Sequence, residues 1–251
     1  MTQNPIHKVL SVLHTHRVRY LLMGGQACIL YGGSELSRDI DIAVLADKDN
    51  VSALKSALDE LQARIIAVPP FAQEYLDRGH AIHFRCNDSI AQGLRIDIMS
   101  RLRNADSFES LWHRRTTAEI PPDIQIDVLS LPDLVKVKKT QRDKDWYHIR
   151  RLIEADYAQF CDSPDESKVT FWLREARTVG ILKDVSARFP RQTAAVASVR
   201  PLLANIAKTA DTEIEVLMKA EEEIERTRDK EYWAPLRREL EQLRHGKQKN
   251  H

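Results

Sequence analysis

Two aspartates stand two residues apart in a short apolar stretch of the chain, SRDIDIAV at residues 37–44. In a β-strand, residues two apart point to the same side, so we expect Asp39 and Asp41 to share one face and Ile40 and Ile42 the other. Hard divalent cations take oxygen ligands, and two convergent carboxylates can hold one against substrate phosphates. Without a cation the carboxylates repel each other, and at least one pKa should rise. The spacing therefore indicates a metal site.

A third acid has similar surroundings, Asp97 in the stretch LRIDIM. If this stretch forms a strand beside the one that carries Asp39 and Asp41, three carboxylates meet at one edge of the sheet. Three such groups suit a two-metal site, in which one ion activates an attacking hydroxyl and the other holds the triphosphate. The alternative is that the acids lie at exposed strand ends, which fits an isolated Asp-x-Asp pattern better.

A pair of glycines precedes the aspartates. The apolar residues 18–23 predict a buried strand that runs directly into Gly24 and Gly25, and residues 26–31 predict a short helix. A strand, a glycine pair and a helix bring backbone N–H groups close to an anion at the positive end of the helix dipole. A glycine pair alone could be only a tight turn. The strand, glycines, helix and Asp-x-Asp together favour a functional site.

The stretch LLMGGQACILYGGSELSRDIDIAV resembles the signature of the nucleotidyltransferase (DNA polymerase β-like) superfamily: an apolar strand, two small residues, a helix and then Asp-x-Asp. That family places its third acid at variable spacing, so Asp127 in IQIDVLS competes with Asp97 for this place. The site that the resemblance implies has Gly24, Gly25, Ser37 and Arg38 near the triphosphate and Asp39, Asp41 and Asp97 as catalytic metal ligands.

A basic cluster follows at residues 134–152, LVKVKKTQRDKDWYHIRRL. On a helix, Lys138 and Arg142 would share a face, which could bind the β- and γ-phosphates. The alternative is a solvated basic helix with local ion pairs. The cluster resembles a later motif of the AbiEii-like subgroup of nucleotidyltransferases, where a second aspartate is common at the place of His148. The nucleotide-binding residues that this resemblance implies are Lys138, Arg142, Lys144 and Asp145.

The two resemblances imply a metal-dependent enzyme that transfers a nucleoside monophosphate from an NTP to a hydroxyl acceptor and releases pyrophosphate. The expected cofactor is Mg²⁺, as two ions, with Mn²⁺ as a substitute. The acceptor is RNA such as tRNA, a protein or a small molecule, and a role as a toxin of a bacterial type IV toxin–antitoxin or abortive-infection system would bring a cognate antitoxin as partner. The alternatives are a non-catalytic nucleotide-sensing or partner-binding protein on the same fold, and a kinase-like phosphotransferase.

The composition sets further limits. The net charge of +1 argues against a general polyanion binder, although a local basic patch remains compatible with it. The three cysteines are widely spaced and form no C-x-x-C motif, so neither a disulfide framework nor a thiolate zinc site is indicated. The apolar runs are too short to span a bilayer. We expect a cytoplasmic protein with no membrane partner.

The periodicity predicts an α/β domain over residues 1–160, a nucleotidyltransferase-type mixed sheet flanked by helices, and a helical domain or tail over residues 161–251. Predicted helices cover residues 5–15, 26–31, 134–139 and 143–156 and a stretch that Asp47 or Asp49 caps. From about residue 163 onward the chain is helix-like, with breaks near Pro190, Pro201 and Asp211. The charged segment 213–243 predicts one or two exposed helices. The predicted strands are residues 18–23, 40–45, 64–68, 81–86, 93–99 and 124–129.

Overall fold

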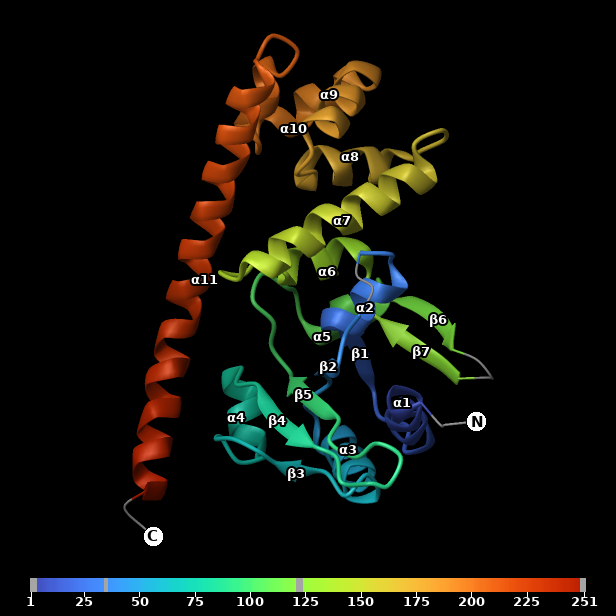
Figure 1. Ribbon diagram of the computed structural model, residues 1–251, viewed down its shortest axis with the longest axis vertical. Coiled ribbons are helices and arrows are strands. Elements are labelled where there is room, and N and C mark those ends of the chain that lie inside the picture. Colours follow the sequence, from blue (N-terminus) through green and yellow to red (C-terminus); the bar gives the residue numbers. More distant parts are fainter. Residues whose placement is uncertain (1–3, 34–35, 121–123, 249–251) are drawn as a thin grey trace. The chain divides into compact units, whose positions relative to one another are not determined.

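The computed structural model describes residues 4–33, 36–120 and 124–248 (Figure 1). The chain divides into two compact units. The first is drawn from residues 1–29, 36–137 and 231–251, and the second from residues 30–35 and 138–230. These limits differ from the predicted division at residue 160, and each unit is described by itself. The predicted break at Pro121 and Pro122 lies outside the described residues.

The first unit is built on a seven-stranded mixed sheet with the strand order β3-β4-β5-β2-β1-β7-β6. β5 lies parallel to β2 and β7 parallel to β1, and the other neighbours are antiparallel. The sheet confirms the predicted mixed α/β fold class. The strands are β1 (Tyr20–Met23), β2 (Asp39–Val44), β3 (Arg64–Ile65), β4 (Ile82–Arg85), β5 (Arg95–Met99), β6 (Thr116–Ile120) and β7 (Ile124–Val128).

Side chains alternate between buried and partly buried along β5 and along the first four residues of β2. Ile40 and Ile42 on β2, like Ile96 and Ile98 on β5, are fully buried on one face of the sheet. The intervening polar residues are only partly buried. Because in-register neighbours share a face, the isoleucines fix which side the aspartates occupy.

Short helices flank the sheet in the first unit. Asp47, one of the two predicted caps, is the N-cap of α3 (Lys48–Glu60), and its side chain accepts a hydrogen bond from the Asn50 backbone N–H at 2.7 Å. Two of the short helices, α4 and α5, and the strand β6 were not predicted, because segments this short carry too little periodicity. The helices are α1 (Pro5–Thr15), α2 (Gly24–Leu30), α3 (Lys48–Glu60), α4 (Gln73–Arg78), α5 (Phe108–His113) and α6 (Leu131–Val137).

The second unit is helical, which confirms the predicted helical C-terminal region. The predicted breaks are confirmed, because Pro190, Pro201 and Asp211 each begin a new element. Of the final helix, residues up to 230 belong to this unit. The elements are α7 (Asp143–Phe160), α8 (Glu166–Glu175), α9 (Val179–Arg188), α10 (Pro190–Ala197), the 3₁₀ helix η1 (Pro201–Asn205) and α11 (Asp211–Gln248).

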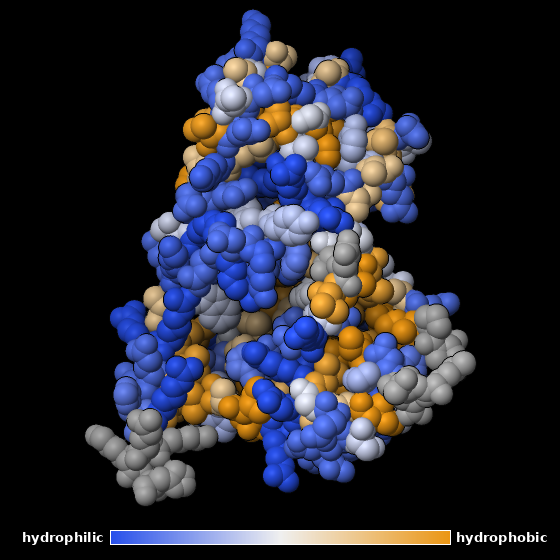
Figure 2. Space-filling view, in the orientation of Figure 1, coloured by the Kyte–Doolittle hydropathy of each residue, from blue (hydrophilic) through white to orange (hydrophobic). Residues whose placement is uncertain are grey.

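The charged C-terminal segment forms one helix, α11, of 38 residues. Figure 2 shows a mostly hydrophilic surface along it, as the sequence predicted. Among its apolar side chains, Ile214 and Met218 are buried. Among the described residues, no helix combines the length and the apolar character needed to cross a bilayer.

Candidate functional site

The predicted carboxylates lie together on one face of the sheet. Asp39 and Asp41 project from β2 on the side opposite the buried isoleucines. β5 pairs with β2 in parallel, so Asp41 stands directly beside Asp97, and Asp39 beside Arg95. This arrangement confirms the strand pairing on which the predicted three-acid site depended. We call Asp39, Asp41, Asp97 and Arg95, with His83 on β4, the carboxylate face.

The predicted glycines pack against this face. Gly24 begins α2 with a φ of +66°, and a Cβ atom added there would lie 1.9 Å from Oδ2 of Asp41. A Cβ atom on Gly25 would lie 2.3 Å from Oγ of Ser37. Both positions thus require glycine, the first for its backbone conformation and for space and the second for space alone. The structure places Gly24 against Asp41 and Gly25 against Ser37, and the predicted contacts of these residues with a triphosphate stay predictions.

The loop before β2 is fixed by its own hydrogen bonds. The Ser37 hydroxyl donates to the backbone carbonyl of Asp39 at 3.2 Å, and the Gln26 side-chain amide donates to the Ser37 carbonyl at 3.1 Å. These bonds tie the start of α2 to the strand that carries the aspartates. The Arg38 side chain is exposed next to this loop.

Asp97 is held by two basic side chains. Arg95 donates to both carboxylate oxygens, from Nε to Oδ1 at 2.6 Å and from Nη2 to Oδ2 at 2.8 Å. Nδ1 of His83 lies 2.8 Å from Oδ1 of the same carboxylate. The Asp97 side chain is 15% exposed. A bidentate arginine at a mostly covered carboxylate is a strong, directional contact.

These contacts set the protonation of Asp97. Burial raises the pKa of the Asp97 carboxyl, and the hydrogen bonds from His83 and Arg95 outweigh that effect, so its pKa lies below the ordinary aspartate value. The hydrogen bonds to Asp97 raise the pKa of Arg95, and the charges of Asp39 and Asp41 act in the same direction. Asp97 is therefore ionised and a weak base while Arg95 is bound to it.

The carboxylate face fits one divalent cation better than two. Asp39 and Asp41 on the same side suit a cation whose other positions are taken by phosphate oxygens and water. Both oxygens of Asp97 are engaged by Arg95. In the part of the chain that the structure describes, no group of three or more His, Cys, Asp or Glu side chains is arranged to hold a metal. Asp97 can join a metal site only if Arg95 withdraws.

Asp127, the competing third acid, lies elsewhere on the sheet. It is on β7, which β1 separates from β2. Its carboxylate accepts hydrogen bonds from Nε of Arg115 at 2.7 Å and from the Thr117 hydroxyl at 3.1 Å. The in-register position beside Asp41 belongs to Asp97, so the strand pairing favours Asp97 as the third acid.

The predicted basic cluster lies in the second unit and surrounds Asp145. This side chain is only 1% exposed and accepts hydrogen bonds from Nζ of Lys138 at 3.3 Å, the Thr140 hydroxyl at 2.6 Å and Nε of Arg142 at 2.7 Å. The Lys138 side chain is 8% exposed. We call Lys138, Thr140, Arg142 and Asp145 the Asp145 cluster. Lys138 is thus buried and bound to Asp145, and its predicted phosphate contact stays a prediction.

The predicted helical face of Lys138 and Arg142 is wrong. α6 ends at Val137 and α7 begins at Asp143, so both residues lie in the connection. The helix stops because this connection bonds elsewhere: the Thr140 carbonyl accepts from the Trp146 indole at 2.7 Å, and the Gln141 N–H donates to Asp229 at 3.1 Å. The side chains of Arg142 and Lys144 are exposed, so their predicted phosphate contacts stay predictions.

His148 lies near the Asp145 cluster on α7. Its Nδ1 atom is buried without a hydrogen-bond partner among the described residues. Burial lowers the pKa of His148, and the positive charge of Lys138 lowers it further. The imidazole is therefore neutral near pH 7, where it could still accept a proton.

Sequence reasoning did not assign roles to Arg95 and His83. The signal for Arg95 was its place two residues before Asp97, which puts both side chains on one face of a strand. His83 becomes a partner of Asp97 only through the antiparallel pairing of β4 with β5. His80 lies three residues earlier, before β4 begins, and its Nε2 atom instead contacts the Glu239 carboxylate at 2.7 Å.

Comparison with known proteins gives little further guidance. No protein-family model and no curated protein sequence matches the chain. A solution structure of the antibiotic-resistance factor ANT(2″)-Ia is similar with a TM-score of 0.35 and 13% identity, over 78% of this chain and 95% of that one. A crystal structure of ANT(2″)-Ia in complex with adenylyl-2″-tobramycin gives a TM-score of 0.33 and 12% identity, over 86% and 93%. Similarity at this level is too weak to assign a function.

Proposed function

We propose that the first unit is a divalent-metal-dependent nucleotidyltransferase that moves a nucleoside monophosphate from an NTP to a hydroxyl acceptor. The observation that carries this proposal is the close packing of Gly24 against Asp41. A backbone without a side chain reaches the carboxylate of one of two acids that share a strand face. Glycine at this position lets the start of α2 approach Asp41 closely, so that backbone N–H groups and a carboxylate-bound cation would contact the same phosphate.

The chain's own residues have distinct roles in this proposal. Asp39 and Asp41 hold Mg²⁺ or Mn²⁺, which supplies Lewis-acid stabilisation of the phosphoryl oxygens when bound. Gly24 and Gly25 let the triphosphate approach the start of α2, and Ser37 and Arg38 border it. These positions orient the α-phosphate toward the acceptor, and positioning with electrostatic stabilisation provides most of the catalysis in phosphoryl transfer.

Arg95 controls the third acid. While it binds Asp97, it neutralises one of the three carboxylates on the face. A bound triphosphate offers the guanidinium an alternative bidentate partner. Exchange of Arg95 from Asp97 to phosphate would then allow Asp97 to complete the metal site, with a second ion, and to accept the proton of the acceptor hydroxyl.

The acceptor is RNA such as tRNA, a protein or a small molecule. A toxin with a cognate antitoxin is the finer form of the proposal, and it rests on the motif at residues 133–145 alone. Incubation of the protein with α-labelled NTPs and a cell lysate, followed by separation of RNA, protein and small molecules, identifies the acceptor class.

Replacement of one carboxylate tests the site. Asp41→Asn should lower transfer of α-label by more than about a hundredfold, since it removes a ligand of the cation that would stabilise the charge on the phosphoryl oxygens, while the thermal transition stays the same or rises. Asp127→Asn, on β7, is the matched control and should keep the activity. Retained activity in Asp41→Asn would refute the site. Label that arrives only from the γ-phosphate would identify a phosphotransferase instead.

A non-catalytic nucleotide-binding protein is the second candidate. The bidentate contact of Arg95 with Asp97 favours it, because a neutralised carboxylate is a poor metal ligand and a poor base. In that case Mg²⁺ with an NTP would raise the melting temperature through binding to the native state, and no transfer of α- or γ-label would be found in any lysate fraction.

A further inference from the structure

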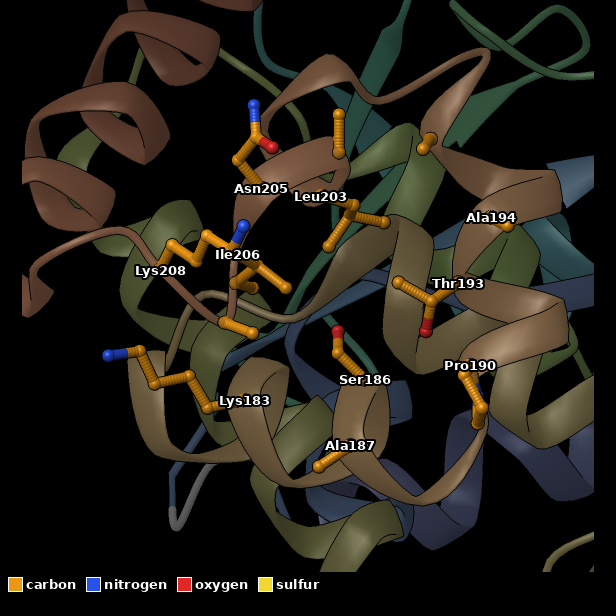
Figure 3. A pocket seen from close by; sticks show the side chains of 13 residues that line it. Lys183, Ser186, Ala187, Pro190, Thr193, Ala194, Leu203, Asn205, Ile206 and Lys208 are labelled. Carbon is orange, nitrogen blue, oxygen red and sulfur yellow. The ribbon is translucent and has the colours of Figure 1, made fainter.

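A hollow in the second unit lies between α9, α10, η1 and the segment that leads into α11 (Figure 3). Its volume is about 580 Å³, within the range of small-molecule sites. Eight of its 13 lining residues are alanine, proline, leucine or isoleucine, and five of these eight are alanines. The short alanine side chains leave the space open, and the wall suits the apolar body of a ligand.

Ser186 on α9 places a polar group in this wall. Its side chain is buried, with 8% of the residue exposed, and its hydroxyl has no hydrogen-bond partner among the described residues. Figure 3 shows this hydroxyl pointing into the hollow. A buried hydroxyl without a partner is unfavourable, and a helical serine commonly bonds to the preceding turn instead. The orientation of Ser186 therefore points to a ligand atom as its partner.

Thr193 on α10 shows the contrasting case in the same wall. Its hydroxyl donates to the backbone carbonyl of Phe189 at 2.9 Å, one turn earlier. It needs no partner from the hollow. Thr193 thus supplies a matched control for any experiment on Ser186.

The charge around the hollow is positive. None of its 13 lining residues, all in the described part of the chain, is acidic, and two are lysines. Lys183 forms an ion pair with Asp211, and its ammonium points away from the hollow (Figure 3). Lys208 has no ion pair among the described residues, and its side chain turns inward. An anionic ligand group would find its counter-charge at Lys208.

We propose that this hollow binds an apolar organic carboxylate that carries a second, hydrogen-bond-accepting oxygen on its body. The carboxylate pairs with Lys208, and the body packs against Leu203 and Ile206. The second oxygen accepts a hydrogen bond from the Ser186 hydroxyl. This site is independent of the proposed nucleotidyl transfer.

A set of closely matched probes tests each contact on the full chain. 4-Benzoylbenzoate has a carboxylate, an aromatic body and a ketone oxygen, and 4-benzylbenzoate has a methylene group in place of the ketone. (4-Benzoylbenzyl)trimethylammonium keeps the ketone and reverses the charge. By calorimetric titration we expect saturable binding of 4-benzoylbenzoate, about fivefold weaker binding of 4-benzylbenzoate, since one hydrogen bond is lost, and no saturable binding of the cation.

Four variants assign these preferences to residues. Ser186→Ala should weaken the binding of 4-benzoylbenzoate about fivefold and change the affinity for 4-benzylbenzoate by less than about twofold. The two probes should then bind with similar affinity. Lys208→Met should weaken both carboxylates about fivefold by removing an exposed charge. Thr193→Val should leave both affinities within about twofold. Ala194→Phe should fill the hollow and abolish binding, with an unchanged circular dichroism spectrum as its folding control.

Photolysis locates the bound probe, because the benzophenone group of 4-benzoylbenzoate labels neighbouring C–H bonds. Labelled peptides should come from residues 183–208 and disappear in Ala194→Phe. Absence of saturable binding at millimolar 4-benzoylbenzoate would overturn the proposal. So would equal loss of both benzoates in Ser186→Ala, unchanged affinity in Ala194→Phe, or labelling outside this range.

Discussion

The carboxylate face and the Asp145 cluster contain similar groups in different settings. Each has an aspartate with a lowered pKa that an arginine and a second basic side chain contact. In the Asp145 cluster the acid is 1% exposed, and Lys138 and Arg142 together provide more positive charge than it carries. On the carboxylate face, Arg95 bonds to Asp97 and is also near the charges of Asp39 and Asp41, and Asp97 is partly open to solvent.

The difference shows what makes such a cluster able to react. A buried acid whose charge is fully compensated stabilises one arrangement of the chain and has little affinity left for a ligand. A partly exposed face with more acids than fixed cations attracts a cation from solution. Both places contain the same kinds of side chain. The carboxylate face and the Asp145 cluster differ in their balance of charge and in their exposure to solvent.

The largest expected effect is on the buried cluster. Lys138→Met leaves Asp145 with less compensation inside the protein and should lower the free energy of unfolding by about 3 kcal/mol, measured by urea denaturation. Lys138→Met/Asp145→Asn should regain part of this loss, because no buried carboxylate remains. If the single variant is as stable as the parent, the Asp145 cluster has no structural role.

Gly24→Ala probes the packing on the carboxylate face. The new Cβ would lie 1.9 Å from the Asp41 carboxylate, and the alanine would have to keep the positive φ of Gly24. We therefore expect the free energy of unfolding to fall by about 2 kcal/mol, or Asp41 to be displaced and cation binding to weaken. Gly93→Ala is the control, since its φ is +79° and no atom lies within 4 Å of the added Cβ. Equal effects of the two variants would show that backbone strain alone is responsible.

Removal of Arg95 should increase the cation affinity of the carboxylate face. Arg95→Gln frees Asp97 and removes one positive charge, so Mn²⁺ measured by electron paramagnetic resonance should bind about tenfold more tightly. Arg85→Gln, the exposed register neighbour on β4, is the control and should change the affinity less. Unchanged Mn²⁺ affinity in Arg95→Gln would contradict the role of Arg95 as counter-ion.

The smallest expected effect is on the pH dependence of stability. Burial raises the pKa of Asp145, but the charges of Lys138 and Arg142 and the hydrogen bonds from Thr140 and Arg142 together outweigh burial and hold the pKa below its ordinary value. The contribution of Asp145 to the free energy of unfolding is therefore complete above the unfolded-state pKa of about 4. It is lost as the pH falls through the lower folded-state pKa. Urea denaturation between pH 2 and 6 should show a shallower acid loss in Asp145→Asn than in the exposed-site control Asp143→Asn. If stability falls with pH equally steeply in the two variants, Asp145 does not have the lowered pKa assigned to it.

Much of the fold followed from local pattern. The alternation of Asp39, Ile40, Asp41 and Ile42 has only one arrangement that buries the isoleucines, so the common face of the aspartates was predictable. Proline and aspartate marked the starts of α10, η1 and α11 for equally local reasons. The short elements α4, α5 and β6 were not predicted, because a few residues are too short a stretch to show a helical or strand periodicity.

Tertiary structure alone decided the rest. The pairing of β5 with β2, which places Asp97 and not Asp127 beside Asp41, joins residues more than 50 positions apart, and no local period encodes it. The contact of Arg95 with Asp97 and the burial of Lys138 depend on which partners compete with water once the chain is packed. The alanine-lined hollow depends on the spacing of three helical elements. Sequence fixes the face on which a side chain lies, since that depends on backbone periodicity, whereas packing determines its partners, since charges and hydroxyls bond to whatever the fold brings near.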